Sequence, residues 1–119
     1  MSIESYENLI VWQKSMDLVV LVYKLTDKFP KEEIYGLSSQ MKRATTSFPS
    51  NIAEGSRRSS RKDFRNFLLN AYGSGAELET QVKISERLKF GKPEDYPKIK
   101  GLLLEIMRML NKLTRELKE

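Results

Sequence analysis

Apolar residues return at alternating steps of four and three along most of this chain. Spacing of this kind places side chains along one face of an α-helix, whereas a strand would alternate apolar and polar residues at every second position. No stretch of the chain alternates in that way. The clearest helical run consists of Phe64, Leu68, Ala71, Gly75, Leu78, Val82 and Ser85. The sequence therefore predicts an all-α fold.

Proline and glycine divide the chain into four helical segments. The predicted helices cover about residues 8–28 and 38–55, a span that begins at residue 60 and includes the apolar run to Ser85, and about residues 97–117. Ser38 and Ser60 are the predicted N-caps, and Gly55 is a predicted C-cap. Amphipathic helices of this length with short connections form an antiparallel, up-and-down four-helix bundle. A chain of 119 residues is long enough for one domain, so we expect residues 1–119 to form a single bundle.

The second predicted helix contains a proline. Pro49 has no N–H to donate to the carbonyl of Thr45, and its ring crowds that turn, so we expect a kink. Polar side chains near Pro49 could form either an active site or a buried hydrogen-bond network that repairs the backbone. One acid without a histidine or cysteine partner is a poor catalytic set, which favours the structural network. Its predicted members are Gln40, Ser47, Asn51 and Glu54.

The third predicted helix has a strong start signal and two unfavourable residues. Ser60-Arg61-Lys62-Asp63 matches a capping box, with Asp63 at the third helical position. Further along, Gly73 and Gly75 each cost about 1 kcal/mol relative to alanine inside a helix. We expect another backbone to approach this helix closely, within the bundle or across a subunit interface.

The positive charge of the chain is concentrated in one segment. Residues 42–65 hold seven basic residues and two acids, and this excess equals the formal net charge of +5 for the whole chain. Several of these cations flank the N-terminus of the third helix, where free N–H groups also favour an anion. The predicted phosphate-binding residues are Lys42, Arg43, Arg57, Arg58, Arg61, Lys62 and Arg65.

Two functional interpretations follow from this charge. The first is a non-enzymatic, homo-oligomeric protein that binds the backbone of RNA or DNA by shape, with strong salt dependence. The second is a scaffold that docks an acidic protein. An enzyme is disfavoured because the chain has no histidine and no cysteine. No cofactor or metal is expected either: di-iron bundles need Glu-x-x-His pairs, so Glu77 or Glu79 is a better salt-bridge partner for an arginine.

The sequence also gives expectations about the compartment. Its first residues lack the basic and apolar regions of a signal peptide, and no apolar run approaches the ~20 residues of a membrane span. We therefore expect a cytoplasmic protein without a membrane partner.

Several stretches of the chain resemble one bacterial family. The matching pieces are VWQKSMDL, FPKEEIYGLSSQMKRA, SFPSNIAEGSRRSS, FLLNAYGSGAELETQ and IMRMLNKL. They are similar to the four-helix bundle proteins also known as 23S rRNA intervening-sequence proteins, a family that itself resembles the accessory variability proteins of diversity-generating retroelements. The latter are homopentamers that bind nucleic acid and a reverse transcriptase. The resemblance implies a bundle, a homopentamer, and RNA or DNA binding.

Overall fold

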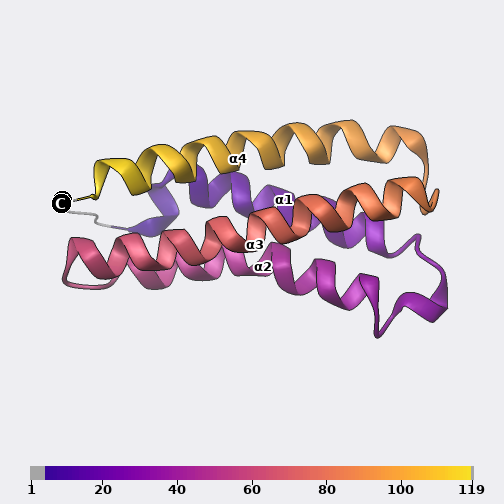
Figure 1. Cartoon of the computed structure of the whole chain (residues 1–119), viewed down its shortest axis with the longest axis horizontal. Helices are drawn as coiled ribbons and strands as arrows, with labels where there is room; N and C mark the ends of the chain where they lie inside the picture. Colours follow the sequence, from indigo (N-terminus) through magenta and orange to yellow (C-terminus); the bar gives the residue numbers. More distant parts are fainter. Residues whose placement is uncertain (1–4, 119) are drawn as a thin grey trace.

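The structure, a computed structural model, describes residues 5–118, and every regular element in that span is helical. The four long helices are α1 (Ile10–Thr26), α2 (Leu37–Ser56), α3 (Arg61–Arg87) and α4 (Tyr96–Glu116). The single-turn 3-10 helices η1 (Tyr6–Asn8), η2 (Lys31–Glu33) and η3 (Pro93–Asp95) precede α1, α2 and α4. The predicted all-α bundle of four helices is confirmed. The four helices lie roughly along the long axis of the molecule (Figure 1). The molecule measures 44 × 24 × 22 Å along its principal axes.

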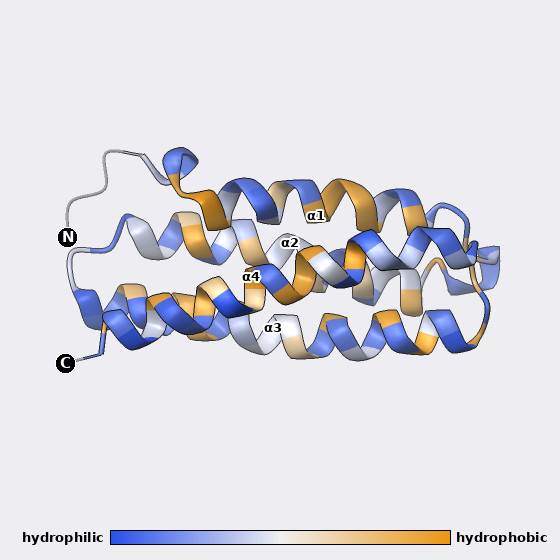
Figure 2. Cartoon of the chain, turned by 90° about the horizontal axis from the view of Figure 1, so that it is seen from above, coloured by the Kyte–Doolittle hydropathy of each residue, from blue (hydrophilic) through white to orange (hydrophobic). Residues whose placement is uncertain are grey.

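The four helices enclose one apolar core. Each helix packs against the next one in the chain, and α4 also packs against α1. The fully buried side chains come from all four helices and include Leu18, Phe48, Leu68, Leu78, Ile106 and Leu110. Apolar and hydrophilic segments alternate along every helix (Figure 2), as the sequence spacing requires. Removing these apolar faces from water is the main force that holds the bundle together.

The start of α2 corrects one prediction. The helix begins at Leu37 with Gly36 as its N-cap, whereas Ser38 is buried inside the first turn and makes no capping hydrogen bond. A carboxylate oxygen of Glu33 instead accepts a hydrogen bond from the Leu37 backbone N–H at 3.2 Å. The Glu33 side chain, from the preceding 3-10 helix, therefore caps the N-terminus of α2 in place of the predicted serine.

Gly55 is not the C-cap residue that the sequence predicted. It lies buried within α2, and Arg57 is the C-cap. A Cβ atom at position 55 would lie 2.7 Å from the Cβ of Phe67 and 3.3 Å from the carbonyl oxygen of Phe64. Glycine is required here because α2 and α3 approach each other too closely for any side chain.

The start of α3 confirms the predicted cap. Ser60 precedes the helix, and its hydroxyl oxygen accepts a hydrogen bond from the backbone N–H of Asp63 at 3.0 Å. This capping bond is formed between residues three apart, so the local sequence was enough to predict it.

Helix α2 is assigned continuously through Pro49. Side chains on both sides of the proline donate hydrogen bonds to backbone carbonyls. The Thr46 hydroxyl donates to the carbonyl oxygen of Lys42 at 3.0 Å, and the Asn51 amide donates to that of Ser47 at 2.9 Å. The kink itself stays a prediction.

The two glycines of α3 have different surroundings. A Cβ at Gly75 would lie 2.1 Å from the Met107 sulfur and 3.2 Å from the Phe48 ring, so this position packs tightly against side chains of α4 and α2. The expected close neighbour is therefore present, but it is a pair of side chains rather than a backbone. Gly73 is exposed, and nothing in the described chain lies within 4 Å of its Cβ position.

A buried tyrosine fastens the connection between α3 and α4, and we expect its hydroxyl to stabilise the fold. Tyr96 is 2% exposed, and its hydroxyl donates to the carbonyl oxygen of Phe90 at 2.6 Å and lies 3.2 Å from the Ser85 hydroxyl. Tyr96→Phe should lower the free energy of unfolding by about 1–2 kcal/mol at neutral pH, because it leaves the half-buried Phe90 carbonyl without this donor. Urea denaturation of both proteins measures this loss, and equal stabilities would contradict it.

The same hydroxyl gives the stability a pH dependence. Burial raises the pKa of Tyr96 above its ordinary value of 10.0, so the unfolded chain releases this proton more readily than the folded one. The advantage of the wild type over Tyr96→Phe should therefore be complete below pH 10 and shrink as the pH rises through the folded pKa. A difference between the two proteins that stays constant across this range would contradict the expected shift.

Candidate nucleic-acid interface

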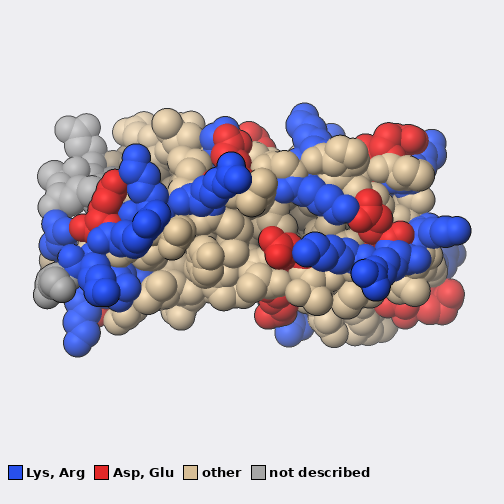
Figure 3. All heavy atoms as spheres, turned by 45° about the horizontal axis from the view of Figure 1, so that its top comes forward, with Lys and Arg blue, Asp and Glu red and all other residues tan. Residues whose placement is uncertain are grey.

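Five of the seven predicted phosphate-binding residues lie at one end of the bundle. Arg57 and Arg58 follow the last turn of α2, while Arg61, Lys62 and Arg65 lie in the first turns of α3. The connection between these helices is at the same end as the end of α4 (Figure 1). In the space-filling view, blue lysine and arginine side chains gather at this end (Figure 3).

Helix α4 brings two further cations that the sequence reasoning missed. Arg115 lies in its last turn and Lys118 follows it. Their position at the end of the fourth helix was visible in the sequence. Cations there also complement the helix dipole, so they do not by themselves indicate a binding site. We call the whole group the basic end: Arg57, Arg58, Arg61, Lys62, Arg65, Arg115 and Lys118. The described acids in the same segments are Glu54, Asp63 and Glu116, so cations outnumber acids by seven to three.

Two arginines of the basic end also hold the fold together. Arg61 donates from Nη2 to the carbonyl oxygen of Glu116 at 2.7 Å, and Arg65 donates from Nε to that of Thr114 at 2.9 Å. The last carbonyls of a helix have no partner within it and carry partial negative charge. These guanidinium groups therefore cap α4 from a neighbouring helix. Each guanidinium has five N–H donors, so some remain for a ligand.

The other cations of the basic end are exposed and do not cap α4. Arg58 forms an ion pair with Glu54 at 2.8 Å and lies 4.8 Å from the centre of the Phe67 ring. An exposed pair four residues apart on a helix stabilises it by only about 0.3–0.5 kcal/mol, so it can reorganise easily. Arg57 lies 5.5 Å from the centre of the Tyr6 ring. Lys62 is exposed and makes no ion pair with any described residue.

Lys42 and Arg43 lie away from the basic end. They belong to the first half of α2, fifteen positions before Arg57 and Arg58, which is about 22 Å along a helix. The Lys42 ammonium group lies 5.1 Å from the centre of the Tyr23 ring of α1, while Arg43 is exposed. The structure thus divides the predicted surface into a cluster of five residues and a distant pair.

Two of the four residues predicted for the polar network, Ser47 and Asn51, are bonded to each other. The Asn51 amide donates to the Ser47 hydroxyl at 2.8 Å, and that hydroxyl lies 2.8 Å from the hydroxyl of Ser74 on α3. Ser74 was missed because it is 27 positions from Ser47 in the sequence. Two predicted members need correction. Gln40 is exposed without a side-chain hydrogen bond to a described residue, and Glu54 is exposed and pairs with Arg58.

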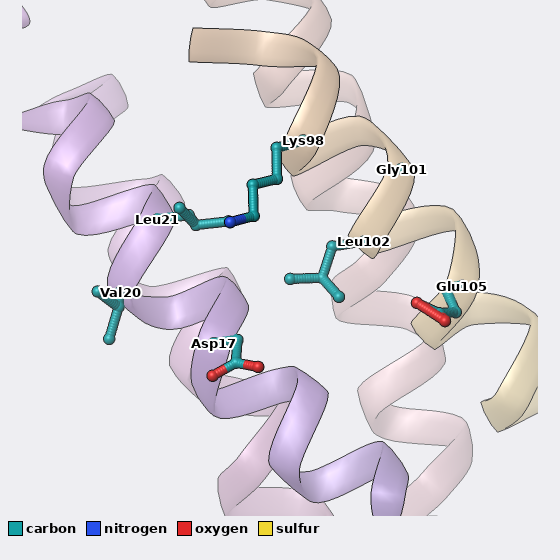
Figure 4. Close-up of a pocket in the computed structure, with 7 residues that line it drawn as sticks. All are labelled: Asp17, Val20, Leu21, Lys98, Gly101, Leu102 and Glu105. Carbon is teal, nitrogen blue, oxygen red and sulfur yellow. The ribbon is translucent and has the colours of Figure 1, made fainter.

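Away from the basic end, a groove of about 640 Å³ lies between α1 and α4 (Figure 4). Its lining includes Val20, Leu21 and Leu102, and the Lys98 side chain extends from α4 towards Leu21 of α1. Among residues 5–118, no group of three potential ligands could hold a metal ion. Glu79 pairs with Lys83 at 3.7 Å rather than with the expected arginine, and Glu77 accepts from Gln81. None of the described helices is long and apolar enough to cross a membrane.

Comparison with known proteins places the chain in a family. Residues 7–112 match the family described as 23S rRNA-intervening sequence protein. The chain belongs to this family. The resemblance drawn from its sequence pieces is confirmed to that extent, while the relation to diversity-generating retroelement proteins stays a prediction. No curated protein matches the chain.

A solved structure has the same fold. It is a protein of unknown function from the S23 ribosomal protein family of Bacteroides thetaiotaomicron, 28% identical, with a TM-score of 0.81. The alignment covers 89% of this chain and 96% of that one. Neither the family description nor the description of the Bacteroides protein names an enzyme.

Proposed function

We propose that this protein binds nucleic acid, with RNA as its first ligand, by holding phosphate groups at the basic end. The observation that carries the proposal is the convergence of cations from α2, α3 and α4 on one end of the bundle. The family's name, which refers to 23S rRNA, supports RNA over DNA.

Stability alone does not account for this arrangement. Arg61, Lys62 and Arg65 lie in the first turns of α3, where the helix dipole makes a cation unfavourable by some tenths of a kcal/mol. Two of these residues have a structural partner in α4, but Lys62 has none among the described residues. A bound phosphate would relieve the mutual repulsion of the cations, and arginine can hold it by two parallel hydrogen bonds.

The chemistry of the basic end favours contact with the backbone of the nucleic acid rather than with base edges. Phosphate contacts position a protein on its ligand but carry no direct sequence information. We therefore expect little sequence preference and a steep salt dependence. We also infer that the protein is a homo-oligomer, as its family resemblance implies. A ring, expected to be a pentamer, would present one basic end per subunit and add weak contacts together.

The test is a salt series of RNA binding with three exposed cations reversed. Lys62→Glu, Arg115→Glu and Lys118→Glu avoid the two arginines that cap α4. The control reverses Lys24, Lys31 and Lys98, which are exposed, make no ion pair with a described residue and produce the same net charge. In fluorescence anisotropy, the basic-end variant should bind a structured RNA at least about tenfold more weakly and lower the salt slope by roughly two to three. The control should lose much less.

Two results would contradict the proposal. Equal losses in both variants would mean that only the net charge matters and that the basic end is no special surface. No RNA binding by the wild type at low salt would favour the second interpretation, a scaffold that docks an acidic protein. The oligomeric mass of all three proteins should be measured in parallel, so that a loss of assembly is not mistaken for a loss of contacts.

A further inference from the structure

Three aromatic side chains lie on the face formed by η1, α1 and α2: Tyr6, Trp12, which also packs against the core, and Tyr23. Tyr6 and Trp12 are half-buried, and Tyr23 is 40% exposed. The rings of Tyr6 and Trp12 meet edge to face, with their centres 5.4 Å apart. Rings held rigidly but left partly open to water offer flat apolar surface to a ligand.

Two predicted phosphate-binding residues lie over these rings. The Arg57 guanidinium lies 5.5 Å from the centre of the Tyr6 ring, and the Lys42 ammonium lies 5.1 Å from that of Tyr23. Arg57, the C-cap of α2, follows Lys42 by fifteen positions, which is about four turns, so the two cations lie towards the same side of the helix. Between them α2 carries Thr46 and Ala53, which are half-buried, and Pro49, which is buried; none of the three is an acid.

This arrangement places Lys42 on the same surface as Arg57 of the basic end, although the two residues are far apart along α2. Arg57 belongs to the basic end and also lies beside Tyr6. Trp12 lies beside Tyr6, and Tyr23 follows eleven positions further along α1 with Lys42 beside it, about 22 Å from Arg57. We call this surface the aromatic track: Tyr6, Trp12, Tyr23, Lys42 and Arg57.

We propose that the aromatic track binds single-stranded nucleic acid, with bases stacked on its rings and phosphates held by Lys42 and Arg57. The inference rests on the proposed function and names its ligand as a single strand. Proteins that bind single strands combine cations that follow the backbone with aromatic side chains on which bases stack. A duplex keeps its bases stacked on each other, so it can use the basic end but not the track.

Trp12 provides a direct probe because it is the only tryptophan of the chain. We would titrate the full protein with an oligouridine and an oligothymidine of about 12 nucleotides, and with a duplex RNA of similar length. Both single strands should quench the Trp12 fluorescence, whereas the duplex should bind without doing so. A difference between the two single strands would separate RNA from DNA as the better ligand.

A matched pair of tyrosine variants tests the track itself. Tyr23 on the track is 40% exposed, and Tyr72 on α3 is 39% exposed and has no cation over its ring among the described residues. Tyr23→Leu should weaken the binding of single strands between about fivefold and a hundredfold, which is the effect of losing one stacked base, and should leave duplex binding unchanged. Tyr72→Leu should change neither.

Several results would overturn the inference. If single strands bind without quenching and Tyr23→Leu behaves like Tyr72→Leu, the track is not used. Loss of binding in the basic-end variant would then still support the proposed function. If neither single strand nor duplex binds at low salt, both proposals fail. If Tyr23→Leu lowers the mass of the oligomer in sedimentation and Tyr72→Leu does not, the α1–α2 face is a contact between copies of the chain, and the inference is wrong.

Discussion

Replacing Gly75 by leucine is expected to lower the free energy of unfolding by about 3 kcal/mol or more. A Cβ at this position would overlap the Met107 sulfur, at 2.1 Å, and press on the Phe48 ring, at 3.2 Å. Met107 is flexible and half-buried, so it could move aside for an alanine. A leucine needs more space than that movement provides, and overfilling a packed core forces side chains and backbone to shift. Urea denaturation monitored by circular dichroism measures the loss.

Gly73 provides a matched control two residues away in the same helix. It is exposed, and no atom of the described chain lies within 4 Å of its Cβ position. Gly73→Leu should therefore leave the stability unchanged or raise it by up to about 1 kcal/mol, because leucine favours a helix more than glycine does. Equal effects of the two substitutions would show that packing at Gly75 is not the cause. A lower oligomeric mass for Gly73→Leu alone would place this glycine at a subunit interface.

Gly55→Leu is expected to have a comparable or larger effect. A Cβ at position 55 would lie 2.7 Å from the Cβ of Phe67. It would also lie 3.0 Å from the ring of Phe64 and 3.3 Å from the carbonyl oxygen of the same residue. Atoms on or next to a backbone cannot swing aside as the end of a methionine can. Helices α2 and α3 would have to separate, at a cost of about 3 kcal/mol or more.

The displacement at Gly55 should also reach the basic end. Arg57, Arg58 and Arg61 follow Gly55 within six positions, and Arg61 reaches across to α4. We therefore expect Gly55→Leu to weaken RNA binding under conditions where the protein is still folded. Gly101→Leu serves as the control, because Gly101 is an exposed glycine of α4 and no atom of residues 5–118 lies within 4 Å of its Cβ position. If Gly55→Leu matches that control in both stability and affinity, the close approach of α2 and α3 is not needed.

The sequence by itself determined the features that depend on neighbouring residues. The steps of three and four positions predicted four helices, because one turn of helix is completed within that distance. The cap at Ser60 was predictable for the same reason, since its hydrogen bond reaches only to Asp63. The excess of positive charge between residues 42 and 65 was also visible in the sequence, but which of these cations lie close together was not.

Contacts between residues far apart in the chain depend on how the helices pack. Arg61 and Arg65 reach carbonyls 55 and 49 positions away, so no local pattern showed that they cap α4. Gly55 looked like the end of a helix because its reason for being glycine, Phe67, belongs to the next helix. The seven predicted cations looked like one surface because they lie within 24 consecutive residues. Along a helix, however, the fifteen positions from Lys42 to Arg57 span about 22 Å. Periodicity determines that a helix forms and which face it buries, but the partner of each side chain depends on how the helices pack.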